Sequence, residues 1–221
     1  MNSPLLIAQD VTKSFTTDGT RTEILRGVSL SLDPGETLAL TGESGSGKST
    51  FLHLLAGLDL PDTGSIRING NSIETLPDTD RAALRRGTVG LVFQQFNLIP
   101  SLTVKGNIAF QARLSDRNDP DRNARLAERL GLSKHLDKYP EALSGGQQQR
   151  VAIARTLAAH PALVLADEPT GNLDEETSAR VLDLMLELVA ETGAGLVTVT
   201  HSARVASRME RSLHLERGRI A

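Results

Sequence analysis

The stretch GESGSGKST, from Gly42 to Thr50, decides the fold of this chain. It matches GxxxxGK[ST] at every fixed position, follows the apolar run Thr37–Thr41, and leads into a helical pattern from Lys48 to Ala56. In this pattern the backbone N–H groups of the loop surround a polyphosphate, while the lysine and the next hydroxyl reach phosphate oxygens and Mg²⁺. The sequence therefore predicts a strand, a phosphate-binding loop and a helix whose N-terminus lies under the phosphates.

Each position of this loop has an expected task. The glycines permit close backbone approach, Lys48 neutralises the β- and γ-phosphates, the Ser49 hydroxyl ligates Mg²⁺, and Thr50 adds a contact to the α-phosphate. The predicted nucleotide contacts are Gly42, Glu43, Ser44, Gly45, Ser46, Gly47, Lys48, Ser49 and Thr50. The alternative, a glycine-rich turn in an unrelated fold, would leave the Lys48 ammonium unpaired in a tightly turning segment, which is energetically unfavourable.

Length and composition limit the classes of protein. The 221 residues, 39% apolar and 23% charged, are typical of one α/β domain or of a core with an inserted lobe. A net charge of −3 and a pI near 6.0 provide no basic surface for nucleic acid, so we expect no nucleic-acid partner. The absence of cysteine excludes disulfides, zinc-thiolate sites and thiol catalysis. The N-terminus does not resemble a secretory signal, and no apolar stretch approaches the ~20 residues of a membrane span.

Four short apolar runs each end at a residue capable of chemistry. Thr37–Thr41 leads into the glycine loop, Val89–Phe93 into Gln94, Leu163–Ala166 into Asp167 and Glu168, and Gly195–Thr200 into His201. We interpret all four as buried parallel strands. Ligands of open α/β sheets bind beyond the carboxyl ends of the strands, so these residues are expected to form one site.

The remaining elements suggest two additions to this core. Leu5–Val11 and Ser65–Asn69 are predicted to form an antiparallel flank. From Gln95 to about His160 the pattern is mostly helical, with helices expected at Thr103–Leu114 and Asp121–Leu130, and we interpret it as an inserted helical lobe. The expected organisation is a nucleotide-binding core at residues 1–94 and 161–221, with a helical subdomain at 95–160.

Asp167 and Glu168 follow the hydrophobic segment LVLA, as expected of a second nucleotide motif. We assign Asp167 to the Mg²⁺ shell and Glu168 to polarising the water that attacks the γ-phosphate, a general-base role. The simpler interpretation is that the two acids only open the turn at Pro169 and Gly171.

The segment LSGGQQQR, from Leu143 to Arg150, is a second candidate phosphate contact. Ser144 stands three residues before Gln147, the spacing of a capping box for a helix through Val151–Ala159. Capping alone does not explain Gly145 and Gly146, because glycine in a helix costs roughly 0.5–1 kcal/mol relative to alanine. We interpret this helix start as a site for phosphate that becomes complete when two copies of the chain meet.

These motifs together resemble the ATPase subunits of ABC transporters over essentially the whole chain. GESGSGKST resembles the Walker A loop, LVLADE the Walker B strand, and LSGGQ the signature motif. Gln94 resembles the Q-loop glutamine, Asp174 in GNLD the D-loop acid, and His201 the switch histidine. The implied fold class is α/β, a P-loop NTPase of ABC type with a mostly parallel core sheet, an antiparallel β flank and an inserted helical subdomain.

The resemblance also implies cofactors, site residues and partners. ATP and Mg²⁺ are the expected cofactors, with Ser49, Gln94 and Asp167 at the metal and with Lys48, Gln94, Glu168 and His201 in catalysis. The contacts expected outside the Walker A loop are Phe15, stacked on the adenine base, together with Ser144, Gly145, Gly146, Gln147 and Asp174. For Phe15, simple packing is the alternative. The implied partners are a second copy in a head-to-tail dimer around two ATP, and a membrane permease docked near Gln94 and the helical lobe.

ADEPTGNLD and FQQFNLIPSLTV resemble the branch of lipoprotein-releasing, macrolide-exporter and YbbA-type ATPases. The hypothesis is a cytoplasmic ATPase, peripheral on the inner membrane through its permease, that extracts or exports lipid-like or hydrophobic cargo. The alternative is a mechanical regulator, like the cell-division ATPase, that transports nothing. DNA-repair and translation ATPases of the superfamily would show a coiled-coil insertion or tandem cassettes, which this sequence lacks. In one departure from the family pattern, Lys105 and Gly106 precede Asn107 where glutamate often precedes asparagine.

Overall fold

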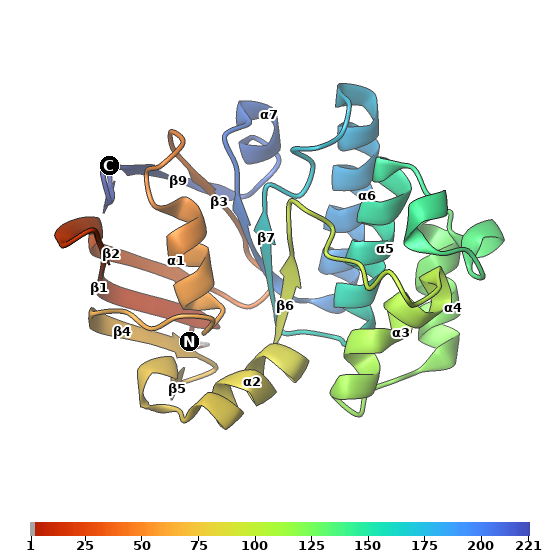
Figure 1. Ribbon diagram of the computed structural model, residues 1–221, viewed down its shortest axis with the longest axis horizontal. Coiled ribbons are helices and arrows are strands. Elements are labelled where there is room, and N and C mark those ends of the chain that lie inside the picture. The colour runs from red at the N-terminus through yellow and green to blue at the C-terminus, as the bar shows by residue number, and fades with distance from the viewer. Residues whose placement is uncertain (1–2) are drawn as a thin grey trace. The chain divides into compact units, whose positions relative to one another are not determined.

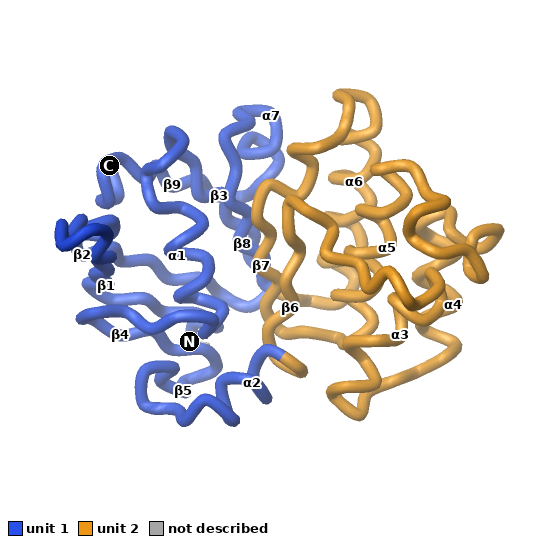
Figure 2. The backbone as a smooth tube through the Cα atoms, in the orientation of Figure 1, with its two compact units in different colours: residues 1–85, 195–221 blue, residues 86–194 orange. Residues whose placement is uncertain are grey.

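A computed structural model describes residues 3–221 of the chain, which form two compact units (Figures 1 and 2). Unit 1 comprises the residues up to Arg85 together with Gly195–Ala221, and unit 2 comprises Arg86–Ala194. The segment 95–160, interpreted from its sequence as a helical lobe, lies in unit 2 together with the β-strand that precedes it and the β-strand that follows it.

Unit 1 contains an antiparallel sheet in the order β2-β1-β4-β5. Its strands are β1 (Leu6–Thr17), β4 (Thr63–Ile68), β2 (Thr20–Leu32) and β5 (Asn71–Ser72). Leu6 pairs with Leu32 of β2 on one side and with Ile68 of β4 on the other, and all three side chains are buried. The antiparallel flank expected from the sequence is thereby confirmed, with longer strands than the apolar pattern indicated.

The second sheet in unit 1 is parallel around β3. The strands are β3 (Thr37–Thr41), β8 (Gly195–Val199), β9 (Arg211–Glu216) and β10 (Arg219–Ile220). β3 pairs in parallel with β8 on one side and with β9 on the other, and β10 pairs antiparallel with β9. Thr41 and Thr200 therefore leave the sheet at the same edge.

Helices complete unit 1. They are α1 (Lys48–Leu55), η1 (Ile73–Thr75), α7 (Ala203–Ala206) and α2 (Asp78–Gly87), which ends at the boundary between the units. The predicted helix from Lys48 is confirmed, and its apolar face, including Phe51 and Leu55, is fully buried. Continuous apolar runs in β3 and β8 and this face of α1 supply the core of the unit.

Unit 2 combines a pair of parallel strands with helices. β6 (Val89–Val92) pairs with β7 (Leu163–Asp167) in parallel, which confirms the interpretation of both apolar runs. The helical elements are α3 (Val104–Leu114), α4 (Pro120–Arg129), η2 (Ser133–His135), η3 (Pro140–Ala142), α5 (Gly145–Ala158) and α6 (Glu175–Thr192). α5 contacts α3, α4 and α6, and residues Val151–Ala154 of α5 are fully buried (Figure 1).

Local signals explain where these helices begin. The Thr103 hydroxyl accepts from the Gly106 N–H at the start of α3, and Asp119 caps α4 with Pro120 at the first helical position. Asp174 caps α6, which ends at Gly193 in the left-handed conformation. Within residues 3–221 no helix has both the length and the apolar content that crossing a membrane requires.

Candidate functional site

The glycine loop of unit 1 joins β3 to α1 in the predicted way. Lys48 is 8% exposed, and its ammonium donates to the carbonyl oxygens of Gly42 at 2.9 Å and Glu43 at 2.7 Å. The side chain therefore folds back across the loop and holds a positive charge at its centre. This pairing also explains how the loop keeps a buried cation without a carboxylate.

The loop has the shape and the free groups of an anion cradle. At Gly42 the backbone φ is 146°, and a Cβ there would lie 2.2 Å from the Leu215 carbonyl oxygen, so glycine is required. The Ser46 hydroxyl is buried and makes no hydrogen bond to any described residue. Buried polar atoms are nearly always paired, so this oxygen fits a site completed by a ligand. A phosphate chain matches such a site, because the N-terminus of α1 follows at once.

Two further candidates lie in unit 1. His201 is exposed in the turn after β8, where the Ser202 N–H bonds the Thr200 hydroxyl and the Ser202 hydroxyl caps α7. Phe15 is 44% exposed on β1, with the Lys13 ammonium 5.3 Å from its ring centroid. Its open ring face is compatible with stacking on a base.

In unit 2 the ends of β6 and β7 bring Gln94 and Glu168 together. Val92 pairs in register with Ala166, so Gln94 and Glu168 follow the same edge of the strand pair. A Cβ built on Gly171 would lie 3.2 Å from the Gln94 amide nitrogen and 3.4 Å from Glu168 Cβ, which places both side chains around one turn. Glu168 has φ of 44°, a conformation uncommon for residues other than glycine and often found at functional sites.

The three residues expected at Mg²⁺ belong to different units. Ser49 follows Lys48 in unit 1, whereas Asp167 ends β7 and Gln94 follows β6 in unit 2. Within residues 3–221 no three carboxylates, imidazoles or thiols cluster in a way that could hold a metal ion. Hydroxyl, carboxylate and amide oxygens are the hard ligands that Mg²⁺ takes in small numbers alongside phosphate and water, so this donor set fits Mg²⁺.

The signature segment forms the capping box that its spacing predicts. The Ser144 hydroxyl accepts from the Gln147 N–H, and the Gln147 side chain accepts from the Ser144 N–H at 2.9 Å. At Gly146 a Cβ would lie 2.5 Å from Thr177 Cγ2, so packing against α6 already requires glycine there. At Gly145 the nearest side chains would stand at 3.5 Å and 3.6 Å, an ordinary contact. Packing against Thr177 is therefore a sufficient reason for glycine at position 146, and close approach of a ligand stays a prediction for Gly145 and Gly146.

Asp174 has a structural task beside its expected functional one. Its carboxylate accepts from the Thr177 N–H at 3.0 Å and caps α6. The hydrogen bonds from the Thr177 backbone and side chain hold the pKa of Asp174 below its usual value, so the cap is charged near neutral pH.

Three side chains that the sequence did not single out fix the backbone after Gln94. Asn172 donates to the Gln94 carbonyl at 2.8 Å. Arg155, buried on α5, donates to the carbonyls of Asn97 at 2.6 Å and Phe96 at 3.1 Å. Burial lowers the pKa of Arg155, and no described carboxylate pairs with it.

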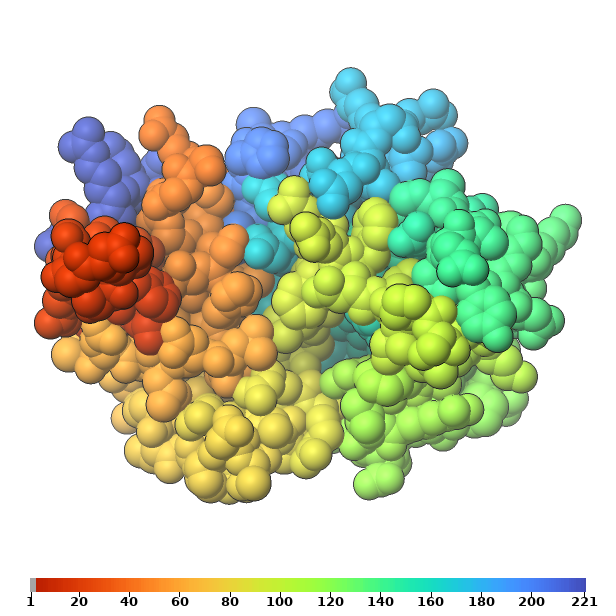
Figure 3. All heavy atoms as spheres, in the orientation of Figure 1, coloured from red at the N-terminus to blue at the C-terminus, as the bar shows by residue number. Residues whose placement is uncertain are grey.

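Asn107 of α3 is the third of these side chains, and it has no exposed surface. Its amide accepts from the Ile99 N–H at 2.8 Å and donates to the carbonyls of Ile99, Leu102 and Thr103. The segment after β6 reaches the surface, where Figure 3 shows it as yellow-green spheres. Its backbone is nevertheless held by Asn172, by Arg155 of α5 and by Asn107 of α3. The signals in the sequence were a polar residue inside an apolar helix face and the asparagine of the family pattern after Gln94.

Comparisons with known proteins agree on one family. A family model described as "ABC transporter" matches residues 25–171. The chain is 43% identical to the lipoprotein-releasing system ATP-binding protein LolD 1 of Rhodopirellula baltica, over 98% of this chain and 96% of that one. It is 42% identical to the macrolide export ATP-binding/permease protein MacB of Syntrophobacter fumaroxidans, over 98% of this chain and 31% of the longer relative.

A solved structure gives the same answer for the fold. It is described as the dimeric structure of a post-hydrolysis state of the ATP-binding cassette MJ0796 bound to ADP and Pi. The TM-score is 0.90 at 36% identity, with 97% of this chain and 96% of the other covered.

Proposed function

Because this chain belongs to the ABC transporter family, as an ATP-binding subunit with ATPase activity, we propose that it hydrolyses ATP with Mg²⁺ to drive a separate membrane permease. The observation that carries the proposal is the glycine loop of unit 1. Its lysine holds a charge across the loop, and the buried Ser46 hydroxyl has no protein partner within residues 3–221. Both features suit a bound polyphosphate.

The proposed roles follow from the chemistry of each residue. Backbone N–H groups between Gly42 and Thr50 hold the phosphates, and Lys48 turns from the loop carbonyls to the β- and γ-oxygens. Phe15 stacks on the base. Glu168 accepts a proton from the attacking water, and His201 donates a hydrogen bond to the γ-phosphate.

Mg²⁺ would be held by Ser49, Asp167 and Gln94. When bound, the ion neutralises charge that develops on the β- and γ-phosphate oxygens. The proposal for Gln94 is supported by the Asn172 hydrogen bond, which holds its backbone carbonyl, and by the position of its amide beside Gly171.

We further propose that two chains associate head to tail around two ATP. Each nucleotide would lie between the glycine loop of one chain and Ser144–Gln147 of the other, with Asp174 beside it. The capping box of Ser144 supports this role, because it fixes the start of α5 and leaves the N–H groups of Gly145 and Gly146 for a phosphate. The MJ0796 cassette, which is described as dimeric, supports the same assembly.

The permease would dock near Gln94 and the helices of unit 2, and so hold the subunit at the cytoplasmic face of the inner membrane. Lipid-like or hydrophobic cargo is the proposed class, since the similar proteins include lipoprotein-releasing and macrolide-export subunits. Detergent extraction of native membranes, affinity capture of the tagged chain and mass spectrometry would test it. Recovery of an integral membrane subunit is expected, and capture of none in the presence of ATP would contradict the proposal.

A kinetic test addresses the chemistry directly. Glu168→Gln should bind ATP with affinity close to that of wild type but hydrolyse it on the order of a hundredfold to ten-thousandfold more slowly. Glu216→Gln, an exposed change on β9, serves as the matched control and should keep full turnover. Wild-type turnover by Glu168→Gln would remove this residue from its proposed role.

A further inference from the structure

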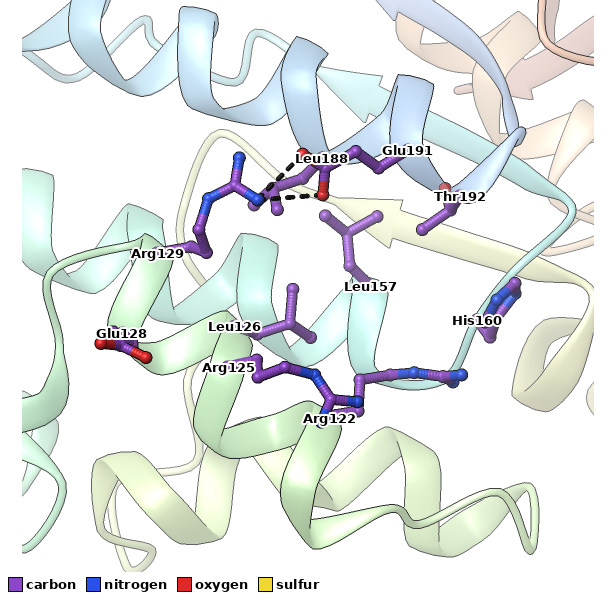
Figure 4. A pocket seen from close by; sticks show the side chains of 10 residues that line it. All are labelled: Arg122, Arg125, Leu126, Glu128, Arg129, Leu157, His160, Leu188, Glu191 and Thr192. Atoms are coloured by element: carbon purple, nitrogen blue, oxygen red, sulfur yellow. Dashed lines mark hydrogen bonds and ion pairs between the residues drawn. The ribbon is translucent and has the colours of Figure 1, made fainter.

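A pocket of about 410 Å³ lies wholly within unit 2, between α4, the end of α5 and the end of α6 (Figure 4). Leu126, Leu157 and Leu188 line it, and Figure 4 shows their side chains pointing into it from three different helices. The volume is in the range of sites for small molecules. None of the residues assigned above to ATP or Mg²⁺ belongs to this pocket.

One side of the pocket is basic. Arg122 and Arg125 line it from α4, and Figure 4 shows Arg122 extending along the side where His160 lies. Neither guanidinium makes an ion pair or a hydrogen bond with any residue that the structure describes. The Asp119 carboxylate accepts hydrogen bonds from the backbone N–H groups of Asp121 at 3.0 Å and Arg122 at 3.1 Å. The bond from the Arg122 N–H is the main cause that lowers the pKa of Asp119, and the charges of Arg122 and Arg125 lower it further.

The two glutamates that line the pocket do not form ion pairs with Arg122 or Arg125. Glu191 is bound by Arg129 at 2.9 Å and 3.0 Å, an interaction that raises the pKa of Arg129. Glu128 also lines the pocket, but Figure 4 shows its carboxylate turned away from the other lining side chains. Two guanidinium groups therefore line an apolar cavity without an ion pair to any described carboxylate.

The walls of the pocket are fixed in place. Arg129 also pairs with Glu187 at 3.4 Å, so two ion pairs join α4 to α6. Arg117 donates to the carbonyls of Gly87 at 2.7 Å and His160 at 3.3 Å, which holds the turn between α5 and β7. A ligand would therefore meet a largely preformed site, and little conformational entropy would be lost on binding.

We propose that this pocket binds an amphiphilic anion, with a phosphate or carboxylate group on Arg122 and Arg125 and an alkyl chain on the three leucines. Guanidinium groups bind such anions in a bidentate way, with charge-assisted hydrogen bonds on both oxygens. The leucines contribute by removing the alkyl chain from water. The occupant joins α4 to α5 and α6, and so stabilises unit 2 by mass action.

Calorimetric titration of the purified chain with butyl, hexyl and octyl phosphate, below their micellar concentrations, tests this proposal. Affinity should rise about fourfold for each methylene added until the cavity is filled. Octyl glucoside, which has the same chain and no charge, should bind at least tenfold more weakly than octyl phosphate. Equal binding of the neutral detergent, or equal affinity across the three phosphates, would overturn the proposal.

Variants identify the site. The double change Arg122→Gln and Arg125→Gln should weaken octyl phosphate at least tenfold, since each charge-assisted hydrogen bond lost is worth that much or more. Arg113→Gln, an exposed change on α3 outside the pocket, should bind as wild type does. An unaltered affinity in the double variant would place the ligand elsewhere and end the proposal. Because the two side chains are unpaired, the variant should fold normally, which circular dichroism checks.

A vesicle assay separates the two sources of such a ligand. Phosphatidylcholine vesicles with and without phosphatidic acid are sedimented with the protein. A membrane lipid is indicated if the protein sediments with the phosphatidic acid vesicles, if octyl phosphate displaces it from them, and if the double variant does not bind them. Binding of octyl phosphate without vesicle association points to a soluble metabolite with the same head and chain.

Discussion

Replacing Asn107 by leucine should destabilise the protein through the loop that follows β6. The side chain is fully buried, and leucine has nearly its shape without its polar atoms. The amide accepts one hydrogen bond from the Ile99 N–H, and its two N–H groups serve three carbonyl oxygens, so we count three full hydrogen bonds. At roughly 1–1.5 kcal/mol each, their loss should lower the free energy of unfolding by about 3–4.5 kcal/mol.

Urea unfolding followed by circular dichroism measures this loss. A decrease of that size is a large share of the ~5–15 kcal/mol typical of folded domains, so the midpoint should fall by more than 1 M. Hydrogen exchange should rise at residues 98–103 before it rises elsewhere. Asn71→Leu, an exposed change in β5 where the amide makes one 3.5 Å bond, should change stability by less than about 0.5 kcal/mol. A loss below ~1 kcal/mol in Asn107→Leu, with exchange unchanged, would show that these hydrogen bonds do not hold the segment after β6.

Three further changes probe unit 2. Arg155→Met removes the hydrogen bonds that hold the carbonyls of Phe96 and Asn97. Hydrogen exchange at residues 96–97 should therefore rise at least tenfold, and ATP hydrolysis should slow. Unchanged exchange would contradict this. Gln149→Met should raise the free energy of unfolding by about 1–3 kcal/mol, because both polar atoms of this fully buried side chain lack a described hydrogen-bond partner. A lower denaturation midpoint in the variant would contradict this expectation. Asp174→Ala should lower the melting temperature at pH 7. Because the pKa of Asp174 is lowered in the folded state, its charge stabilises the fold above pH 3.8, and the difference in melting temperature between wild type and variant should narrow as the pH falls below that value. A difference that stays constant with pH would exclude the charged cap as the cause.

The strands of the core could be predicted because each is a continuous apolar run ended by glycine, amide or acid. β3 and β7 follow this pattern with boundaries within one residue of those expected. β2 could not be predicted in the same way. Its first four residues are exposed, and register shifts in its pairing with β1 interrupt the alternation of apolar and polar positions.

The candidate site divides along similar lines. Residues whose chemistry depends on local spacing, such as the glycine loop and the Ser144 capping box, were identified from the sequence. Asn107, Arg155 and Asn172 were not, because their partners are backbone carbonyls that only the tertiary fold brings near. At position 146 the sequence suggested a ligand, whereas the need for glycine comes from close packing against Thr177 of α6. Local sequence cannot distinguish a ligand from a packed side chain in such a case.

If ATP joins two copies of the chain, the mass of Glu168→Gln in solution should depend on the nucleotide. Multi-angle light scattering during gel filtration should give 23.7 kDa without nucleotide and twice that mass with saturating ATP and Mg²⁺. Lys48→Ala, which lacks the charge across the glycine loop, should stay at the single-chain mass under both conditions. A single-chain mass for Glu168→Gln while ATP is bound would contradict the account.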